Sequence, residues 1–176
     1  PRNARALLVS AIRDPDPVIF YEPKAIYRAF REEVPEKEEV IPIGKSQIVR
    51  VGQDLTMISY GAMMRPTLKA AAEIEKKHGT SIEIIDILTI APLDSNTVVE
   101  SVSKTGRCVI VQEAPRSFGL SSELTACIND KAFLYLEAPV KRLTGYDVVT
   151  PYFGREKSYL PNAPRVVHAI EETLNF

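Results

Sequence analysis

The 176-residue sequence has no tryptophan, only two cysteines and two histidines, and almost no net charge, because 22 basic residues face 23 acidic ones. The balanced charge leaves no basic surface of the kind that binds nucleic-acid phosphates, so nucleic acid is not an expected partner. No apolar run approaches the roughly 20 residues that cross a bilayer, and the first residues show no signal-peptide pattern. We therefore expect a soluble, intracellular protein that does not enter a membrane.

The few cysteines and histidines exclude two further classes of site. Cys108 and Cys127 lie in segments that resemble a strand and the apolar face of a helix, so a disulfide framework is not expected. His78 and His168 lack the neighbouring Cys, Asp or His residues that build a metal site. The sequence therefore predicts no metal centre based on histidine or cysteine.

With 45% hydrophobic residues, the chain is long enough to form one compact domain with an additional element. Residues 4–12 have helical apolar spacing, and the sequence Asp14-Pro15-Asp16-Pro17 ends that helix because proline removes a donor and restricts its predecessor. Residues 18–21 predict a short buried strand. Residues 22–42 are charged and punctuated by proline, which indicates a linker between domains.

From residue 47 onward, strand and helix patterns alternate. Residues 48–51 and 55–60 are rich in β-formers and are separated by a turn at Gly52, which predicts a hairpin. Further strands are expected at 82–88, 107–112 and 140–143, and helices at 65–78, 96–104, about 120–128 and 166–174. Such alternation is typical of an α/β fold with a mostly parallel sheet that is covered by helices on both faces.

The expected turns contain no recognisable catalytic motif. The turn around Gly61 has one glycine instead of a dinucleotide fingerprint, and a close strand–helix packing turn is the favoured interpretation. Residues 112–116 follow a strand, where α/β proteins often bind ligands, but a surface pair of Glu113 and Arg116 explains them more simply. Asp86 and Asp94 are interpreted as carboxylates that cap loops at a strand end.

Asp14 and Asp16 have two interpretations. Two carboxylates beside the exposed carbonyls of a terminating helix provide hard oxygen ligands for a cation. The same residues are also common as turn caps, and from the residues alone this second interpretation is favoured.

Several segments together resemble one family, in their order and spacing. They are LLVSAIRDPDPVIFYEPKAIYRAFREEVP (7–35), IPIGKSQIVRVGQDLTMISYGAM (41–63), DILTIAPLD (86–94), GRCVIVQEAPR (106–116), LEAPVKRLTGYDVVTPY (136–152) and the terminal AIEETLNF. These segments are similar to the β subunits of pyruvate and branched-chain 2-oxo acid dehydrogenases, which depend on thiamin diphosphate. One departure is Leu88, where many members of the family carry an arginine before the residue that corresponds to Thr89.

The resemblance implies a division of the chain into three parts. Residues 1–30 correspond to the end of a pyrimidine-binding domain, 31–41 to a linker, and 42–176 to a complete carboxy-terminal domain of the transketolase type. The implied fold is a three-layer α/β sandwich with a mostly parallel sheet. The family's activating glutamate and active-site histidine map upstream of Pro1, so the resemblance assigns no catalytic or cofactor-binding residue here, and the chain alone is expected to be inactive.

The resemblance also implies cofactors and two sites. In the parent enzyme, thiamin diphosphate is held through magnesium by the α subunit, so this chain alone is not expected to bind either. A structural potassium site of branched-chain members aligns with Ala11, Asp14 and Asp16, without the family's other ligands. An acidic surface that docks the acyltransferase core aligns with Glu137 and the terminal carboxylate of Phe176.

The implied function is the assembly and docking part of a β subunit, whose parent decarboxylates a 2-oxo acid and transfers the acyl group to lipoyl-lysine. The implied partners are the α subunit, a second β subunit, and the peripheral-subunit-binding domain of dihydrolipoamide acyltransferase. The implied location is the cytoplasm, or the mitochondrial matrix in a eukaryote. The alternatives are a free-standing transketolase-type α/β dimerisation module, and part of a transketolase or a deoxyxylulose phosphate synthase.

Overall fold

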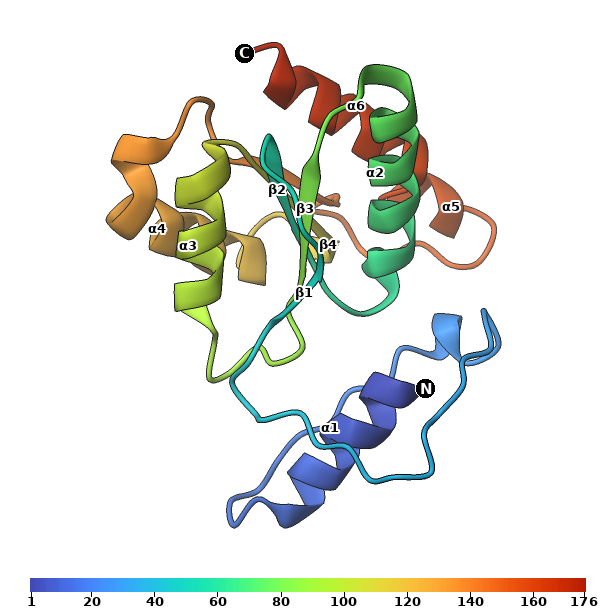
Figure 1. Cartoon of the computed structure of the whole chain (residues 1–176). Helices are drawn as coiled ribbons and strands as arrows, with labels where there is room; N and C mark the ends of the chain where they lie inside the picture. Colours follow the sequence, from blue (N-terminus) through green and yellow to red (C-terminus); the bar gives the residue numbers. More distant parts are fainter.

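Five strands form a single sheet in the computed structural model, which describes all 176 residues (Figure 1). The strands are β1 (Gln47–Arg50), β2 (Leu55–Ser59), β3 (Ile82–Asp86), β4 (Cys108–Pro115) and β5 (Lys141–Gly145). The α-helices are α1 (Arg2–Arg13), α2 (Met64–His78), α3 (Ser95–Thr105), α4 (Leu120–Ala132), α5 (Glu156–Tyr159) and α6 (Ala163–Leu174). Three short 3₁₀ helices are η1 (Lys24–Ile26), η2 (Gly61–Met63) and η3 (Phe133–Tyr135).

The sheet has the strand order β1-β3-β2-β4-β5. Strand β2 is parallel to β3 and β4, β4 is parallel to β5, and β1 is an antiparallel edge strand. Helices α2 and α6 pack on one face, and α3 and α4 pack on the other (Figure 1). Every residue of β2 is buried, as expected for a strand that is covered on both faces. The predicted three-layer α/β sandwich with a mostly parallel sheet is confirmed.

The predicted hairpin between residues 48–51 and 55–60 is wrong. Strand β1 pairs with β3, with Ile48 opposite Ile85, and β2 lies on the other side of β3. The connection crosses the start of β3, where a Cβ on Gly52 would lie 2.2 Å from the amide nitrogen of Glu83. The mostly exposed β1 forms the edge of the sheet, whereas the fully buried β2 lies between β3 and β4.

Local signals locate the helices well. Helix α2 ends at Gly79, which has the left-handed φ of 70° that glycine adopts without a steric penalty. Asp94 is a cap, as predicted, but it caps the start of α3 and not a strand end: its side chain accepts hydrogen bonds from Thr97 and from the amide of Ser46. The hydrogen bonds outweigh the effect of burial and lower the pKa of Asp94. The prediction that Asp86 is also a cap is wrong, since its side chain accepts no hydrogen bond and burial raises its pKa to about 7.

The first 46 residues have little internal packing. The predicted strand at 18–21 is wrong, because this segment has no strand beside it with which to form a sheet. Residues 22–42 contain only η1 as regular structure. Helix α1 lies against residues 32–41 and below the sheet in Figure 1, and Ala6 is its only buried residue. None of the helices combines the length and the apolar character that would be needed to span a membrane.

Candidate docking surface

The two residues predicted to dock a partner lie at the same edge of the sheet. The parallel strands begin at this edge, which we call the amino edge, and Glu137 directly precedes β5 there. Helix α6 runs back along β5: Arg165 near its start bonds a carbonyl at the end of β5, and Glu172 near its end lies 2.6 Å from Lys141 at the start of β5. The terminal Phe176 is therefore at the amino edge, where the C-terminus appears at the top of Figure 1.

Glu137 is exposed but is not a free carboxylate. Its Oε2 atom lies 2.5 Å from the guanidinium of Arg107, and 59% of its side chain remains accessible. Its amide donates a hydrogen bond of 2.7 Å to the carbonyl of Gly106. Gly106 has a φ of 69°, and a Cβ there would lie 2.9 Å from Cγ of Glu137. The positive φ favours glycine at the end of α3, and the absence of a side chain there leaves room for the Glu137 side chain.

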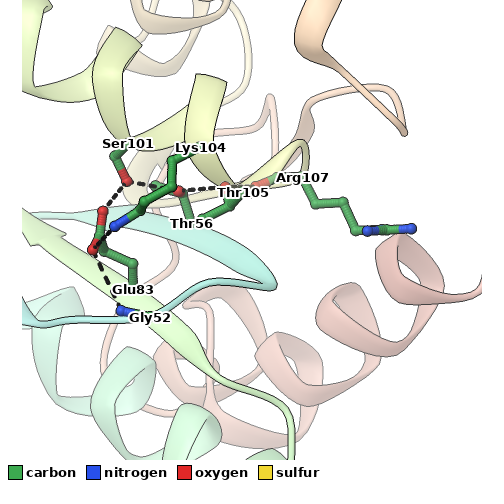
Figure 2. Close-up of polar contacts among 7 residues, drawn as sticks. All are labelled: Gly52, Thr56, Glu83, Ser101, Lys104, Thr105 and Arg107. Atoms are coloured by element: carbon green, nitrogen blue, oxygen red, sulfur yellow. Dashed lines mark hydrogen bonds and ion pairs between the residues drawn. The ribbon is translucent and has the colours of Figure 1, made fainter.

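A buried polar cluster lies behind this edge, between α3 and the sheet (Figure 2). The carboxylate of Glu83, only 1% exposed, accepts hydrogen bonds of 2.5 Å from both Lys104 and Ser101, and one of 3.3 Å from the amide of Gly52. Burial alone would raise the pKa of Glu83, but these three donors outweigh it and the pKa is lowered. Glu83 is therefore a paired, ionised carboxylate at neutral pH.

The cluster also holds the last turn of α3. The Thr56 hydroxyl lies 2.7 Å from the hydroxyls of Ser101 and Thr105, and Thr105 donates to the carbonyl of Arg107 at 3.2 Å. Figure 2 shows the Arg107 side chain pointing away from the cluster. The buried cluster thus positions the backbone from which Arg107 reaches Glu137.

The structure brings no metal-binding cluster together. No group of three or more His, Cys, Asp or Glu side chains converges among the 176 residues. His78 and His168 lie 3.5 Å and 3.7 Å from Glu171 and Glu172 on the surface of α6. Cys108 is buried in β4, and its burial raises the pKa of the thiol. The described residues therefore do not fit a magnesium-bound diphosphate.

The predicted cation ligands occupy the turn that follows α1. Asp14 is the C-terminal cap of the helix, and its Oδ1 atom accepts a hydrogen bond of 3.0 Å from the amide of Asp16. Ala11 is in the last turn of the same helix. The hydrogen bond is the turn-capping arrangement, and it leaves the second oxygen of Asp14 and the carboxylate of Asp16 without a protein partner.

The opposite edge of the sheet, the carboxyl edge, differs from its prediction. The buried Gln112 side chain accepts from the amide of Ser121 at 2.8 Å and donates to the carbonyl of Pro115 at 2.9 Å, so it joins β4 to α4. The predicted pair of Glu113 and Arg116 is wrong, since no ion pair joins them. Asp147 instead orders this loop through two hydrogen bonds of 2.9 Å to Ser117.

Comparison with known proteins adds the family. The family model described as "Transketolase, C-terminal domain" matches residues 44–166. The chain belongs to this family. The matched range contains all five strands, the helices α2, α3 and α4, and the first turn of α6. The transketolase-type domain is therefore the unit that carries Glu137 and Arg107.

Two relatives resemble the whole chain, including the part before the transketolase-type domain. The "Pyruvate dehydrogenase E1 component subunit beta" of Bacillus subtilis is 48% identical over 176 residues, which is 100% of this chain and 54% of that protein. The subunit of the same name from Staphylococcus aureus is 45% identical over the same range. The chain spans about half the length of these relatives.

Solved structures support the fold. A "Split gene transketolase, inactive beta4 tetramer" has a TM-score of 0.65 and 24% identity, and the match covers 82% of this chain and 46% of that one. A 2-oxoglutarate:ferredoxin oxidoreductase from Magnetococcus marinus has a TM-score of 0.51 and 11% identity, with coverages of 74% and 19%. At these identities the likeness shows a shared arrangement of the transketolase-type domain only.

Sequence reasoning did not identify the partner of Glu137. Arg107 stands 30 positions earlier, immediately before β4, and nothing in its local pattern distinguishes it from any other charge before a strand. The cluster around Glu83 was missed for the same reason. The available signal was Glu83 itself, a charged residue within the otherwise apolar start of β3, since a charge in a strand buried on both faces requires a partner.

Proposed function

We propose that this chain is the assembly and docking part of a β subunit of a pyruvate dehydrogenase E1 component. The observation that carries the proposal is the 48% identity to such a subunit, which extends over every residue of the chain. The activity proposed for the parent enzyme is decarboxylation of pyruvate and transfer of the acyl group to lipoyl-lysine. The names of the relatives favour pyruvate over branched-chain acids, and they favour this function over a transketolase, a deoxyxylulose phosphate synthase or a free-standing module.

The proposal includes the rest of the parent assembly. The α subunit and a second β subunit are the proposed partners, thiamin diphosphate with magnesium is the proposed cofactor of the assembled enzyme, and the cytoplasm is the proposed location. Residues 1–30 are assigned to the end of a pyrimidine-binding domain, 31–41 to a linker and 42–176 to the carboxy-terminal domain. The match of the relatives across residues 1–43, outside the transketolase-type domain, supports this division.

The proposed docking site for the peripheral-subunit-binding domain of the acyltransferase is the amino edge. Glu137 and the carboxylate of Phe176 provide two acidic groups at this edge, and charge-assisted pairs with basic residues of the partner strengthen as the interface excludes water. Because Glu137 is already paired with Arg107, a basic residue of the partner has to share or displace that guanidinium. Arg107 therefore weakens docking while it positions the carboxylate.

Calorimetric titration of the chain with a peripheral-subunit-binding domain tests the proposal. We expect Glu137→Gln to weaken binding about tenfold, because one charged pair is lost at a partly exposed position. Deletion of Phe176 should have a similar effect because it moves the terminal carboxylate. Arg107→Gln should instead strengthen binding, since it frees Glu137.

Glu113→Gln is the matched control for the docking test. This carboxylate is exposed at the carboxyl edge, far from the proposed docking site. Its removal changes the net charge by the same amount as Glu137→Gln but should not change the affinity for the peripheral-subunit-binding domain. Equal weakening by Glu137→Gln and Glu113→Gln would show that only overall charge matters. Absence of binding by a chain that elutes as a folded species in gel filtration would contradict the proposed docking function.

The turn after α1 is proposed as a weak potassium site, formed by the Ala11 carbonyl and the carboxylates of Asp14 and Asp16. Support comes from the helix-end carbonyls beside two carboxylates that retain free oxygens. We expect a thermal midpoint about 1 °C higher in potassium chloride than in choline chloride, and loss of that difference in Asp16→Asn. Equal midpoints in both salts for the unaltered chain would contradict the site.

A further inference from the structure

An open cavity lies between the segment around η1 and the first turn of α2. Its volume is about 440 Å³, and it is open to solvent on one side rather than enclosed. The residues that line it are Lys24, Ala25, Tyr27, Arg28, Ala29 and Arg65. Two segments that are about 40 positions apart in sequence therefore form one cavity.

The charges around this cavity are of one sign. Lys24, Arg28 and Arg65 line it, and no carboxylate does. None of these three cations takes part in an ion pair, although Arg2, Arg13, Arg50 and Arg107 all do. Three unpaired like charges around one cavity repel one another, and an anion between them would convert that repulsion into attraction.

The nearest acidic side chain along the chain is already engaged. Glu22 accepts a hydrogen bond of 2.6 Å from the hydroxyl of Tyr27, which raises the pKa of that phenol. This contact turns the carboxylate toward the tyrosine hydroxyl, and Glu22 is not among the residues that line the cavity. No ion pair joins Glu22 or any other carboxylate to Lys24, Arg28 or Arg65, so the three cations remain available to an anion.

The two segments that form the cavity contact each other at the carboxyl edge of the sheet. Gly61 has a φ of 56°, and a Cβ on it would lie 3.4 Å from Cγ of Pro23, so the segment before η1 packs on the turn that leads into α2. Arg65 is the second residue of α2, whose N-cap residue Met63 forms no capping hydrogen bond through its side chain. The 3₁₀ helix η2 leads directly into α2, and the amide of Met64 donates to the carbonyl of Gly61, so the positive charge at the cavity comes from the three basic side chains.

We propose that this cavity binds a phosphate-class oxyanion, either free phosphate or the phosphoryl group of a small metabolite. Guanidinium groups donate in pairs to such oxygens, and the ammonium of Lys24 supplies a further point charge. Tyr27 and the two alanines offer an apolar wall for an organic part of the ligand. The site is independent of the docking surface, which lies at the opposite edge of the sheet.

Calorimetric titration of the chain with inorganic phosphate and with glycerol phosphate, at constant ionic strength, tests the proposal. We expect saturable binding of one or both anions. Arg28→Gln and Arg65→Gln should each weaken the affinity at least fivefold, and the double variant should abolish saturation. Both side chains are exposed and unpaired, so the variants should keep the far-ultraviolet circular dichroism and thermal midpoint of the unaltered chain.

Arg31→Gln is the matched control, because Arg31 is also exposed and unpaired but does not line the cavity. Its affinity should equal that of the unaltered chain. Tighter binding of glycerol phosphate than of phosphate would assign the site to a phosphorylated metabolite, and the reverse order would assign it to free phosphate. No saturable binding of either anion, equal weakening by Arg31→Gln, or binding of an acidic peptide alone would overturn the proposal.

Discussion

Residues 1–46 and residues 47–176 are ordered by different forces. The second region contains 42 of the 43 buried residues, among them the two apolar clusters of 14 and 10 residues on either side of the sheet, whereas the first contains only Ala6. Helix α1 is attached to the linker by ion pairs of Pro1 with Glu32, Arg2 with Glu39, and Arg13 with Glu38. Exposed ion pairs contribute little to the free energy of folding, and salt screens them. The structure of the first region should therefore be more sensitive to salt than that of the second.

The two regions also differ in how firmly they position the residues of the proposed sites. The transketolase-type domain positions the docking residue Glu137 beside α3 and β5, and it contributes Arg65, at the start of α2, to the proposed anion cavity. The first region contributes Lys24 and Arg28 to the proposed anion cavity from a segment with few buried contacts. Binding of an anion there would therefore also attach the first region to the domain.

The largest difference should appear when the same residue type is truncated in both regions. Ile84 is fully buried in β3, and Ile84→Ala should lower the free energy of unfolding by about 3 to 4 kcal/mol because it leaves a cavity. Ile12 in α1 is 75% exposed, and Ile12→Ala should change that free energy by less than about 0.5 kcal/mol. Urea unfolding measures both values, and similar losses would contradict the division into two regions.

Removal of one partner of an ion pair should give the next largest difference. Lys104→Met leaves Glu83 buried and unpaired, and because Lys104 is partly exposed we expect a loss of about 2 to 3 kcal/mol. The folded-state pKa of Glu83 is lowered, so this contribution is present above about pH 4.5 and disappears as the pH falls through the folded-state pKa.

Arg13→Met is the control for that change in the first region. It breaks the exposed pair with Glu38, and the expected loss is less than about 0.5 kcal/mol at any pH. Urea titrations of both variants at pH 7 and at pH 3 provide the comparison. A loss for Lys104→Met that persists undiminished at pH 3 would show that packing, not the charge of Glu83, is responsible.

Asp86 lies where the two regions meet, opposite Gln47, whose side chain accepts a hydrogen bond of 2.9 Å from Asn3. Burial raises its folded-state pKa from 3.8 to about 7. Between these two values the folded protein binds a proton that the unfolded chain has lost, so stability falls as the pH rises through this window. Asp86→Asn should therefore stabilise the protein by about 2 kcal/mol at pH 8, allowing for partial exposure.

The gain from Asp86→Asn should vanish below pH 3.8, where the carboxyl is neutral in both states. Thermal unfolding of the two proteins at pH 8 and pH 3.5 measures it. Asp147→Asn should have the opposite effect. Hydrogen bonds from Ser117 lower the pKa of Asp147, so removal of this carboxylate should destabilise the folded protein at pH 8. A destabilised Asp86→Asn protein at pH 8 would show that the carboxylate has a stabilising partner in solution.

The smallest effect should come from salt. An increase from about 0.05 M to about 0.5 M sodium chloride shortens the screening length below about 5 Å and weakens the three ion pairs of α1. We expect hydrogen-exchange protection of α1 amides to fall about threefold, equivalent to about 0.6 kcal/mol, while α2 amides are unchanged. Unchanged protection in α1 would mean that apolar contacts, and not charge, hold this helix.

Much of the fold was predictable because it follows from short-range patterns. Gly79 and Asp94 end and start helices through interactions within one turn, so the helices around them were located correctly. The hairpin was predicted wrongly because pairing is a choice among strands, and the choice depends on which neighbour covers β2. Of the candidate sites, Glu137 and Phe176 were assigned by resemblance, but the pairing of Glu137 with Arg107 was not.

The sequence by itself determined the alternation of strands and helices, their glycine and aspartate boundaries, and the resemblance that leads to the transketolase C-terminal domain family. Only the tertiary structure decided the strand order, the unpartnered state of Asp86, and the cavity that joins Arg28 to Arg65. The reason is physical. Boundaries depend on backbone groups within about four residues, whereas strand pairing, desolvation and charge depend on neighbours that folding brings from distant parts of the chain.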